Sequence, residues 1–291
     1  MADSASEEAQ RPQSQSQSQS QSQSQSQSQP PQKPAKRDAF TELLSPKPKH
    51  PKPTPKPTPT PTPTASSHRR RIGGPRDALG AYITQPTSHP NTVIYQTPLF
   101  VAIHDAFPKS TVHLLLLPRD SQKTRLHPFS AFEDLDFLAG VKTEAAKLKR
   151  LAAGELRRIH GKYSLQERAR QQALDIDPAP EELPAGRDWE REIMCGVHAH
   201  PSMNHLHVHV ISVDRFSERL KHRKHYNSFS TPFFVDLEDL PLAKDDVRRD
   251  PDGEGYLRRD LVCWRCGRGF GNRFAELKVH LQEEFGEWRR L

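Results

Sequence analysis

Three histidines alternate with apolar residues in the segment His205-Leu-His207-Val-His209-Val-Ile211. Alternate side chains of a β-strand lie on one face, so this spacing predicts that the three imidazole rings share a face while the apolar residues between them enter the core. Imidazole suits both nucleophilic attack near pH 7 and hydrogen bonding to phosphate. A surface strand and a histidine zinc site are the alternatives. At ~3.3 Å per residue the rings would spread over roughly 13 Å, which favours a phosphate-sized cleft over a single ion.

A second group of residues with potential chemistry lies near the C-terminus. Cys263-Trp-Arg-Cys266 is followed after thirteen residues by His280, a spacing typical of zinc ligands. So small a segment cannot be stabilised by burial alone, and we therefore expect one structural zinc ion per chain. Glu284 lies one helical turn beyond His280 and is the predicted fourth ligand. Its competitor Glu283 would point about 100° away from it.

Basic residues cluster directly after the histidine-rich segment. Such a cluster is usually a solvated surface, but beside a strand that handles phosphate it is placed to bind a polyanion. Its members are Arg215, Arg219, Lys221, Arg223 and Lys224. Further arginines surround the cysteines, which is consistent with contact to a DNA backbone. Trp264 could stack on a base or cap the core, and the sequence leaves both alternatives open.

The overall composition separates a tail from the folded part of this 291-residue chain. Residues 13–63 are Ser-Gln, Lys-Pro and Pro-Thr repeats, which bury too little apolar surface to offset chain entropy, and we predict a disordered tail over residues 1–74. Through Arg71 the tail carries 11 basic and 5 acidic residues, which leaves 32 and 31 for the remainder. The net charge of +7 therefore belongs mainly to the tail, and nucleic-acid binding by the folded part must depend on local clusters.

Three signals within the tail each have two interpretations. The Ser-Gln repeat of residues 14–29 is either an expansion without structure or a target of DNA-damage kinases. The spacing of Phe40, Leu43 and Leu44 predicts one apolar face of a short helix, which is either a docking motif for a partner or a chance cluster. The basic groups of residues 33–37 and 69–71 are a nuclear address or a solubilising linker. We favour the nuclear address. No signal-peptide pattern or run of eighteen apolar residues indicates secretion or a membrane span, and three cysteines, two of them as Cys263-x-x-Cys266, argue against a disulfide framework and for a reduced compartment.

The elements that must position these side chains can be predicted from periodicity. Two short strands are expected over residues 91–103, a buried strand over 112–117, one long helix over 128–160 and a second helix over 164–174. Strands are expected again over 192–198 and 205–213. This order predicts an α+β domain over residues 75–245, in which helices pack on one face of an antiparallel sheet. A zinc-finger domain is expected over residues 246–291.

Several of these segments together resemble one family. The alternating pattern from His205 to Ile211 resembles the signature of the histidine-triad nucleotide hydrolases and transferases. Residues 197–212, the basic segment 221–229 and the finger resemble the aprataxin branch, in its fungal-type form, and residues 105–115 are similar to the family's nucleotide-holding segment. The resemblance covers about residues 79–291, and the triad, the basic segment and the finger in this order are a specific combination.

The resemblance implies a DNA-repair hydrolase that removes AMP from the 5′ end of DNA after abortive ligation. By this resemblance His207 attacks the α-phosphorus and forms a covalent AMP intermediate. His205 and His209 orient His207 and donate hydrogen bonds to phosphate oxygens, and His198 stabilises the leaving phosphate. Asp105 would bind the ribose hydroxyls, Lys109 would support Asp105, and Ser202 would contact phosphate. His113 is interpreted as structural support. The residues expected to contact DNA are Lys221, Arg223, Lys224, Trp264 and Arg265.

Two rival functions use the same residues differently. A general nucleotide phosphoramidase or dinucleotide hydrolase would act on free small molecules, yet a free nucleotide needs neither the finger nor the basic cluster of residues 215–224. A non-catalytic adaptor that binds DNA ends would need no intact triad. The sequence therefore favours an enzyme whose partner is DNA and whose product is AMP, with other partners recruited through the tail.

Overall fold

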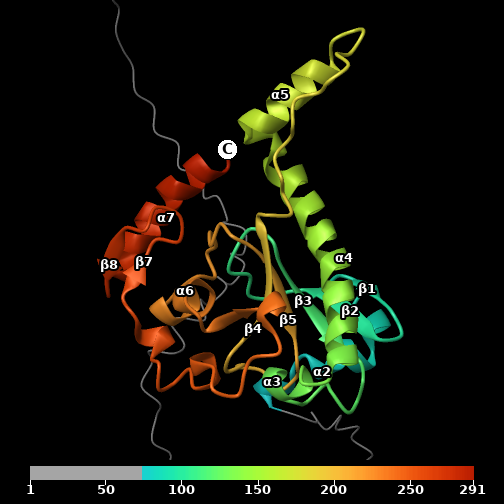
Figure 1. The fold of residues 1–291 in the computed structure, drawn as a ribbon, viewed down its shortest axis with the longest axis vertical. Helices are drawn as coiled ribbons and strands as arrows, with labels where there is room; N and C mark the ends of the chain where they lie inside the picture. The colour runs from blue at the N-terminus through green and yellow to red at the C-terminus, as the bar shows by residue number, and fades with distance from the viewer. Residues whose placement is uncertain (1–73) are drawn as a thin grey trace, which may run out of the picture. The chain divides into compact units, whose positions relative to one another are not determined.

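The computed structural model describes residues 74–291, so the predictions for the tail lie outside the described residues. Its main element is a six-stranded antiparallel sheet in the order β1-β2-β3-β5-β4-β6 (Figure 1). The strands are β1 (Val93–Gln96), β2 (Phe100–His104), β3 (His113–Pro118), β4 (Ile193–His198), β5 (Val208–Ser212) and β6 (Phe234–Asp236). The helices are α2 (Gly80–Thr84), α3 (Pro128–Ala131), α4 (Leu135–His160), α5 (Leu165–Leu174), α6 (Arg223–Ser230) and α7 (Phe274–Trp288). The predicted α+β class is confirmed.

The two faces of the sheet are both covered, although the sequence predicted helices on one face only. Leu114 and Leu116 of β3 belong to the large core that α4 completes on one face (Figure 1). Leu115 and Leu117, which alternate with them, pack with Ile83 of α2 in a second core. The apolar run of β3 is continuous because both of its faces are buried.

Two predicted elements have different limits in the structure. The helix expected over residues 128–160 is broken into α3 and α4, because Asp134 caps α4 by accepting a hydrogen bond from the amide of Phe137 at 3.1 Å. The strand expected from His205 begins only at Val208. Upstream of it the backbone leaves the sheet, since the Leu206 amide donates to the carbonyl of Thr124 at 2.8 Å.

The C-terminal segment forms a small hairpin and a helix. β7 (Leu261–Val262) pairs with β8 (Gly269–Gly271), and α7 packs on them. The turn after the second cysteine is made by Gly267, whose φ of 74° favours glycine. The core of this segment includes Tyr226 of α6, and Trp288 at the end of α7 enters the core of the large sheet. The finger is therefore packed into the rest of the described chain. None of the described helices is long and apolar enough to cross a membrane.

Candidate active site

A cavity of about 420 Å³ opens where β5, the β2–β3 loop, α2 and α6 meet. Most of the side chains that the sequence singled out for phosphoryl chemistry line it. These are Asp105, Lys109, His113, His198, Ser202, His207, His209 and Lys224. Residues separated by more than a hundred positions in the chain are thus brought to one place, as a catalytic site requires.

The protonation of His207 follows from a single hydrogen bond. Its Nδ1 lies 2.7 Å from the carbonyl oxygen of His205, and because a carbonyl can only accept, Nδ1 must carry the proton. Nε2 is then left with its lone pair. The residue is 5% exposed, and this burial lowers the pKa of His207, against the opposing effects of the His205 carbonyl and Asp105. A neutral imidazole with a free Nε2 is the form that a nucleophile requires.

His209 is polarised by a chain of hydrogen bonds that begins at the backbone. The amide of Lys109 donates to Nδ1 of His113 at 3.2 Å, so Nε2 of His113 carries the proton and donates to Nδ1 of His209 at 2.9 Å. His209 must then hold its own proton on Nε2. That buried atom has no hydrogen-bond partner in the described part of the chain, so it is a donor available to a ligand oxygen. Burial holds the pKa of His209 well below its usual value and lowers that of His113 to about 4.

The loop between β2 and β3 supplies a carboxylate and an amine to the same cavity. Asp105 accepts a hydrogen bond from the amide of Phe107 at 2.6 Å through Oδ1, and its Oδ2 lies 3.5 Å from Nε2 of His113. The ammonium of Lys109 donates to the carbonyl of Phe107. Burial lowers the pKa of Lys109, while Asp105 acts in the opposite direction.

The aromatic ring of Phe229, a residue not predicted to belong to the site, packs against three of the histidines. Its centroid lies 5.4 Å from that of His113, 5.2 Å from that of His209 and 4.7 Å from that of His198. The burial that results holds the pKa of His198 well below its usual value. The one signal in the sequence was that Phe229 is the last residue of the segment 221–229, which resembles the family.

An apolar wall of the cavity was also missed. It consists of Leu79, Tyr82, Ile103, Leu115, Met203 and Phe233. A flat apolar ligand group could be buried against this wall. These residues come from five separate segments, and no local pattern groups them.

The ring of His205 does not lie on the face where the sequence predicted it. Its ring does not line the cavity but lies against α2, where a Cβ atom added to Gly80 would come within 3.0 Å of it. The reason is that the chain is irregular before Val208, so the period-2 argument does not extend to His205. His205 contributes through its carbonyl, which orients His207. Leu206, Val208 and Val210 are buried as predicted.

The predicted zinc ligands converge at the finger. The candidate ligand atoms of Cys263, Cys266, His280 and Glu284 all lie within 4.8 Å of one another. Nε2 of His280 is 3.1 Å from Sγ of Cys266 and 3.2 Å from Oε1 of Glu284. Glu283 instead faces Nδ1 on the other side of the ring, at 3.8 Å. Two sulfurs, one imidazole and one carboxylate are a donor set that suits zinc.

The five predicted DNA contacts come from two parts of the chain, the start of α6 and the finger. Lys224 lines the cavity and the hollow next to it, while Lys221 is exposed just before α6 and Arg223 opens that helix. The guanidinium of Arg265 pairs with Glu284. The ring of Trp264 packs on both the large core and the finger core and lies 5.3 Å from the guanidinium of Arg215. The ring therefore packs on the core but is only half-buried, and stacking on a base stays a prediction.

Comparisons with known proteins agree with this geometry. A model of the HIT domain matches residues 87–216, and a model of the C2HE / C2H2 / C2HC zinc-binding finger matches residues 230–287. The aprataxin-like protein of Saccharomyces cerevisiae is 40% identical over 216 residues, which cover 72% of this chain and 95% of that protein. The aprataxin-like protein of Schizosaccharomyces pombe is 36% identical over 218 residues, or 73% of this chain and 82% of that one. A crystal structure of the aprataxin ortholog Hnt3 in complex with DNA superimposes with a TM-score of 0.58 at 32% identity, covering 73% of this chain and 96% of that one. A structure of Hnt3 in complex with DNA and guanosine gives 0.57 at 34% identity over the same shares.

Proposed function

The chain belongs to the aprataxin family of histidine-triad proteins, and from this premise we propose that it is a DNA-repair hydrolase that removes AMP from adenylated 5′ ends of DNA. The observation that carries the proposal is the hydrogen bond from Nδ1 of His207 to the carbonyl of His205. It leaves Nε2 of His207 as a nucleophile in a cavity lined by groups that can bind phosphate.

In the first step Nε2 of His207 attacks the phosphorus of the AMP group. A P–N bond forms, the P–O bond to the 5′-phosphate of the DNA breaks, and that phosphate leaves. The imidazole becomes cationic, and its Nδ1–H bond to the His205 carbonyl becomes charge-assisted and stronger. The free Nε2–H of His209 can donate to a phosphoryl oxygen as charge develops on it.

In the second step a water molecule attacks the same phosphorus. A P–O bond forms, the water loses one proton to the solvent, and the P–N bond breaks with its electron pair returning to Nε2. AMP is released, and His207 returns to its neutral form with the proton still on Nδ1. Because its pKa is lowered by burial, the ring is neutral again near pH 7 and ready for another turnover.

The remaining groups define the substrate. We propose that the adenosine lies against the apolar wall formed by Leu79 and Tyr82, with Asp105 accepting hydrogen bonds from the ribose hydroxyls. Ser202 and Lys224 are exposed residues that line the cavity; Ser202 would contact the phosphate of AMP, and Lys224 would contact a phosphate of the DNA chain. Lys221, just before α6, and Arg223, its first residue, add positive charge near Lys224, which suits a polynucleotide rather than a free nucleotide.

The finger requires zinc in this proposal. Its donor set fits a closed structural site, in which the metal supplies folding energy and takes no part in the phosphoryl chemistry. Arg265 would hold Glu284 in place through the ion pair between them. We further propose that the protein acts in the nucleus, where ligation of chromosomal DNA generates adenylated ends.

The test compares wild type and His207→Ala on nicked DNA with an adenylated 5′ end. Release of AMP should fall by at least about 1,000-fold, because the nucleophile is lost, while DNA binding stays near wild type. His222→Ala is the control, since this histidine is exposed and lies outside the cavity; it should retain wild-type hydrolysis of adenosine 5′-phosphoramidate. If wild type hydrolyses the phosphoramidate but not the adenylated DNA, the general phosphoramidase is the correct function.

A further inference from the structure

A buried arginine joins the finger helix to the catalytic sheet. Arg187 lies in the loop before β4, and only 4% of its side chain is exposed. Its guanidinium is 4.6 Å from the ring centroid of Trp189 and 4.8 Å from that of Trp288. Two indole rings on one guanidinium make a cation–π contact that is shielded from water.

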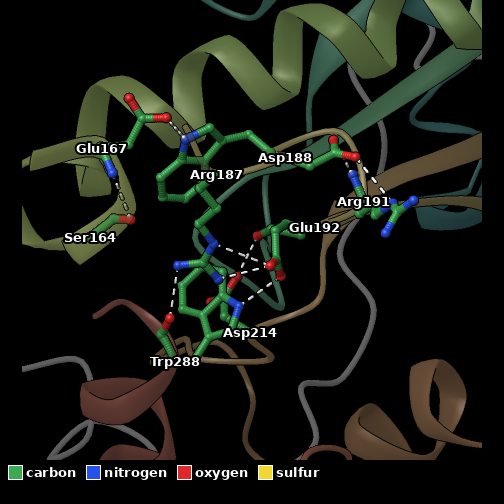
Figure 2. A network of polar contacts seen from close by, with 10 residues as sticks. Ser164, Glu167, Arg187, Asp188, Arg191, Glu192, Asp214 and Trp288 are labelled. Carbon is green, nitrogen blue, oxygen red and sulfur yellow. Dashed lines mark hydrogen bonds and ion pairs between the residues drawn. The ribbon is translucent and has the colours of Figure 1, made fainter. Parts of the chain in front are cut away.

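The hydrogen bonds of Arg187 reach two parts of the chain at once. Nε and Nη2 bind Oε1 of Glu192 at 3.2 and 2.8 Å, and Nη1 donates to the main-chain carbonyl of Trp288 at 2.8 Å (Figure 2). Nε1 of Trp288 donates to the other oxygen of Glu192 at 2.7 Å. The carbonyl is at the C-terminal end of α7, where the helix dipole favours a cation.

Both sides of this contact lead to functional residues. Glu192 immediately precedes β4, which ends at His198, and its carbonyl accepts a hydrogen bond from the amide of Val213, the residue after β5. On the other side Trp288 lies one turn, about 6 Å, beyond the predicted zinc ligand Glu284 on α7. The strands that carry His198 and His209 are thus joined through one guanidinium to the helix that carries the zinc site.

We propose that Arg187 is a positioning residue for DNA substrates: it holds α7 in one orientation on the sheet, so that DNA bound by the finger presents its adenylated end to His207. This inference rests on the proposed function. The rate of attack falls steeply when a bound substrate is displaced even slightly from the reactive geometry. An interaction that fixes the orientation of the finger therefore contributes to turnover on DNA. A small adenylate does not touch the finger, and its hydrolysis does not depend on Arg187.

The experiment uses Arg187→Met and a matched control in the same loop. Arg191 lies four residues away, its side chain is 87% exposed, and its ion pair is with Asp188 of the same loop (Figure 2). For Arg187→Met, kcat/KM on adenylated nicked DNA should fall at least about tenfold and on adenosine 5′-phosphoramidate less than about threefold. Zinc content should stay at one per chain. Arg191→Met should match wild type on both substrates.

Arg187→Met leaves Glu192 without its cation, which destabilises the fold, so Arg187→Lys is the second variant. A lysine keeps the charge but cannot span Glu192 and the Trp288 carbonyl together, so its loss on DNA should lie between those of wild type and Arg187→Met. Whichever of the two variants folds is used to decide whether Arg187 is needed for turnover on DNA. Wild-type activity on DNA, or equal losses on both substrates, overturns the inference. If wild type itself fails on adenylated DNA, it is the proposed function that fails.

Discussion

His160 gives the sharpest prediction about how burial affects this protein. It is the last residue of α4 and packs edge to face on Phe285 and Trp288, 5.3 and 5.6 Å away between centroids. Burial, reinforced by Arg289 and Arg187, lowers the pKa of His160 from 6.5 to about 4. The dipole of α4 favours a charged histidine at this end, but by less than about 1 kcal/mol, so desolvation prevails.

The sign and size of the effect follow from linkage. The unfolded chain binds the proton more tightly than the folded one, so the contribution of His160 to stability is complete above about pH 6.5 and is lost as the pH falls toward 4. With these two pKa values the loss between pH 8 and pH 5 is about 2 kcal/mol. His160→Leu removes the proton site and retains most of the apolar packing.

The assay is urea unfolding of wild type and His160→Leu at pH 8 and pH 5, with saturating zinc, followed by tryptophan fluorescence. From pH 8 to pH 5 the free energy of unfolding should decrease in both proteins. The decrease should be about 2 kcal/mol smaller in His160→Leu than in wild type. At pH 8 the two proteins should agree within about 1 kcal/mol, because the bond from His160 to Thr111 is long, at 3.4 Å. An identical pH dependence in both proteins would refute this account of His160.

Three further predictions concern the site and the finger. His205→Ala should lose less than about tenfold in turnover, because its carbonyl, not its ring, contacts His207; a loss as large as that of His207→Ala would contradict the placement of the ring. Glu284→Gln should release zinc to a chelator faster than wild type, Glu284→His should restore retention, and Glu283→Gln should have no effect, since it lies on the far side of His280; metal analysis after dialysis distinguishes these outcomes. Lys224→Ala should weaken DNA binding and reduce the slope of log affinity against log salt by about one, with little change on adenosine 5′-phosphoramidate; an unchanged slope would exclude a phosphate contact.

The sequence predicted those features that depend on local periodicity. Val208 and Val210 alternate with His207 and His209, and this pattern alone indicated which side chains enter the core. The zinc cluster also followed from spacing, because a helix brings His280 and Glu284 to one face over a single turn. Such features need only the geometry of one element.

Features that depend on contacts between distant segments could not be predicted. The start of β5 is set by the hydrogen bond from the Leu206 amide to the carbonyl of Thr124, eighty-two residues earlier. His205 therefore lies outside the strand, and the prediction that its ring shares a face with His207 and His209 was wrong. Arg187 lies among charged residues in a loop, and its partner Trp288 is 101 residues away. Nothing in its local sequence distinguishes it from the exposed Arg191.

The most direct test of the central claim is to trap the covalent intermediate. Wild-type protein is mixed with adenylated nicked DNA, quenched in alkali within the first turnover, digested and analysed by mass spectrometry, because a phosphoramidate is labile in acid. We expect one adenylyl group on the peptide that contains His207, bound to Nε2, since Nδ1 is held by the His205 carbonyl. The group should be absent from His207→Ala. Full turnover on DNA with no adenylated histidine, or an adenylyl group on another residue, would contradict the account.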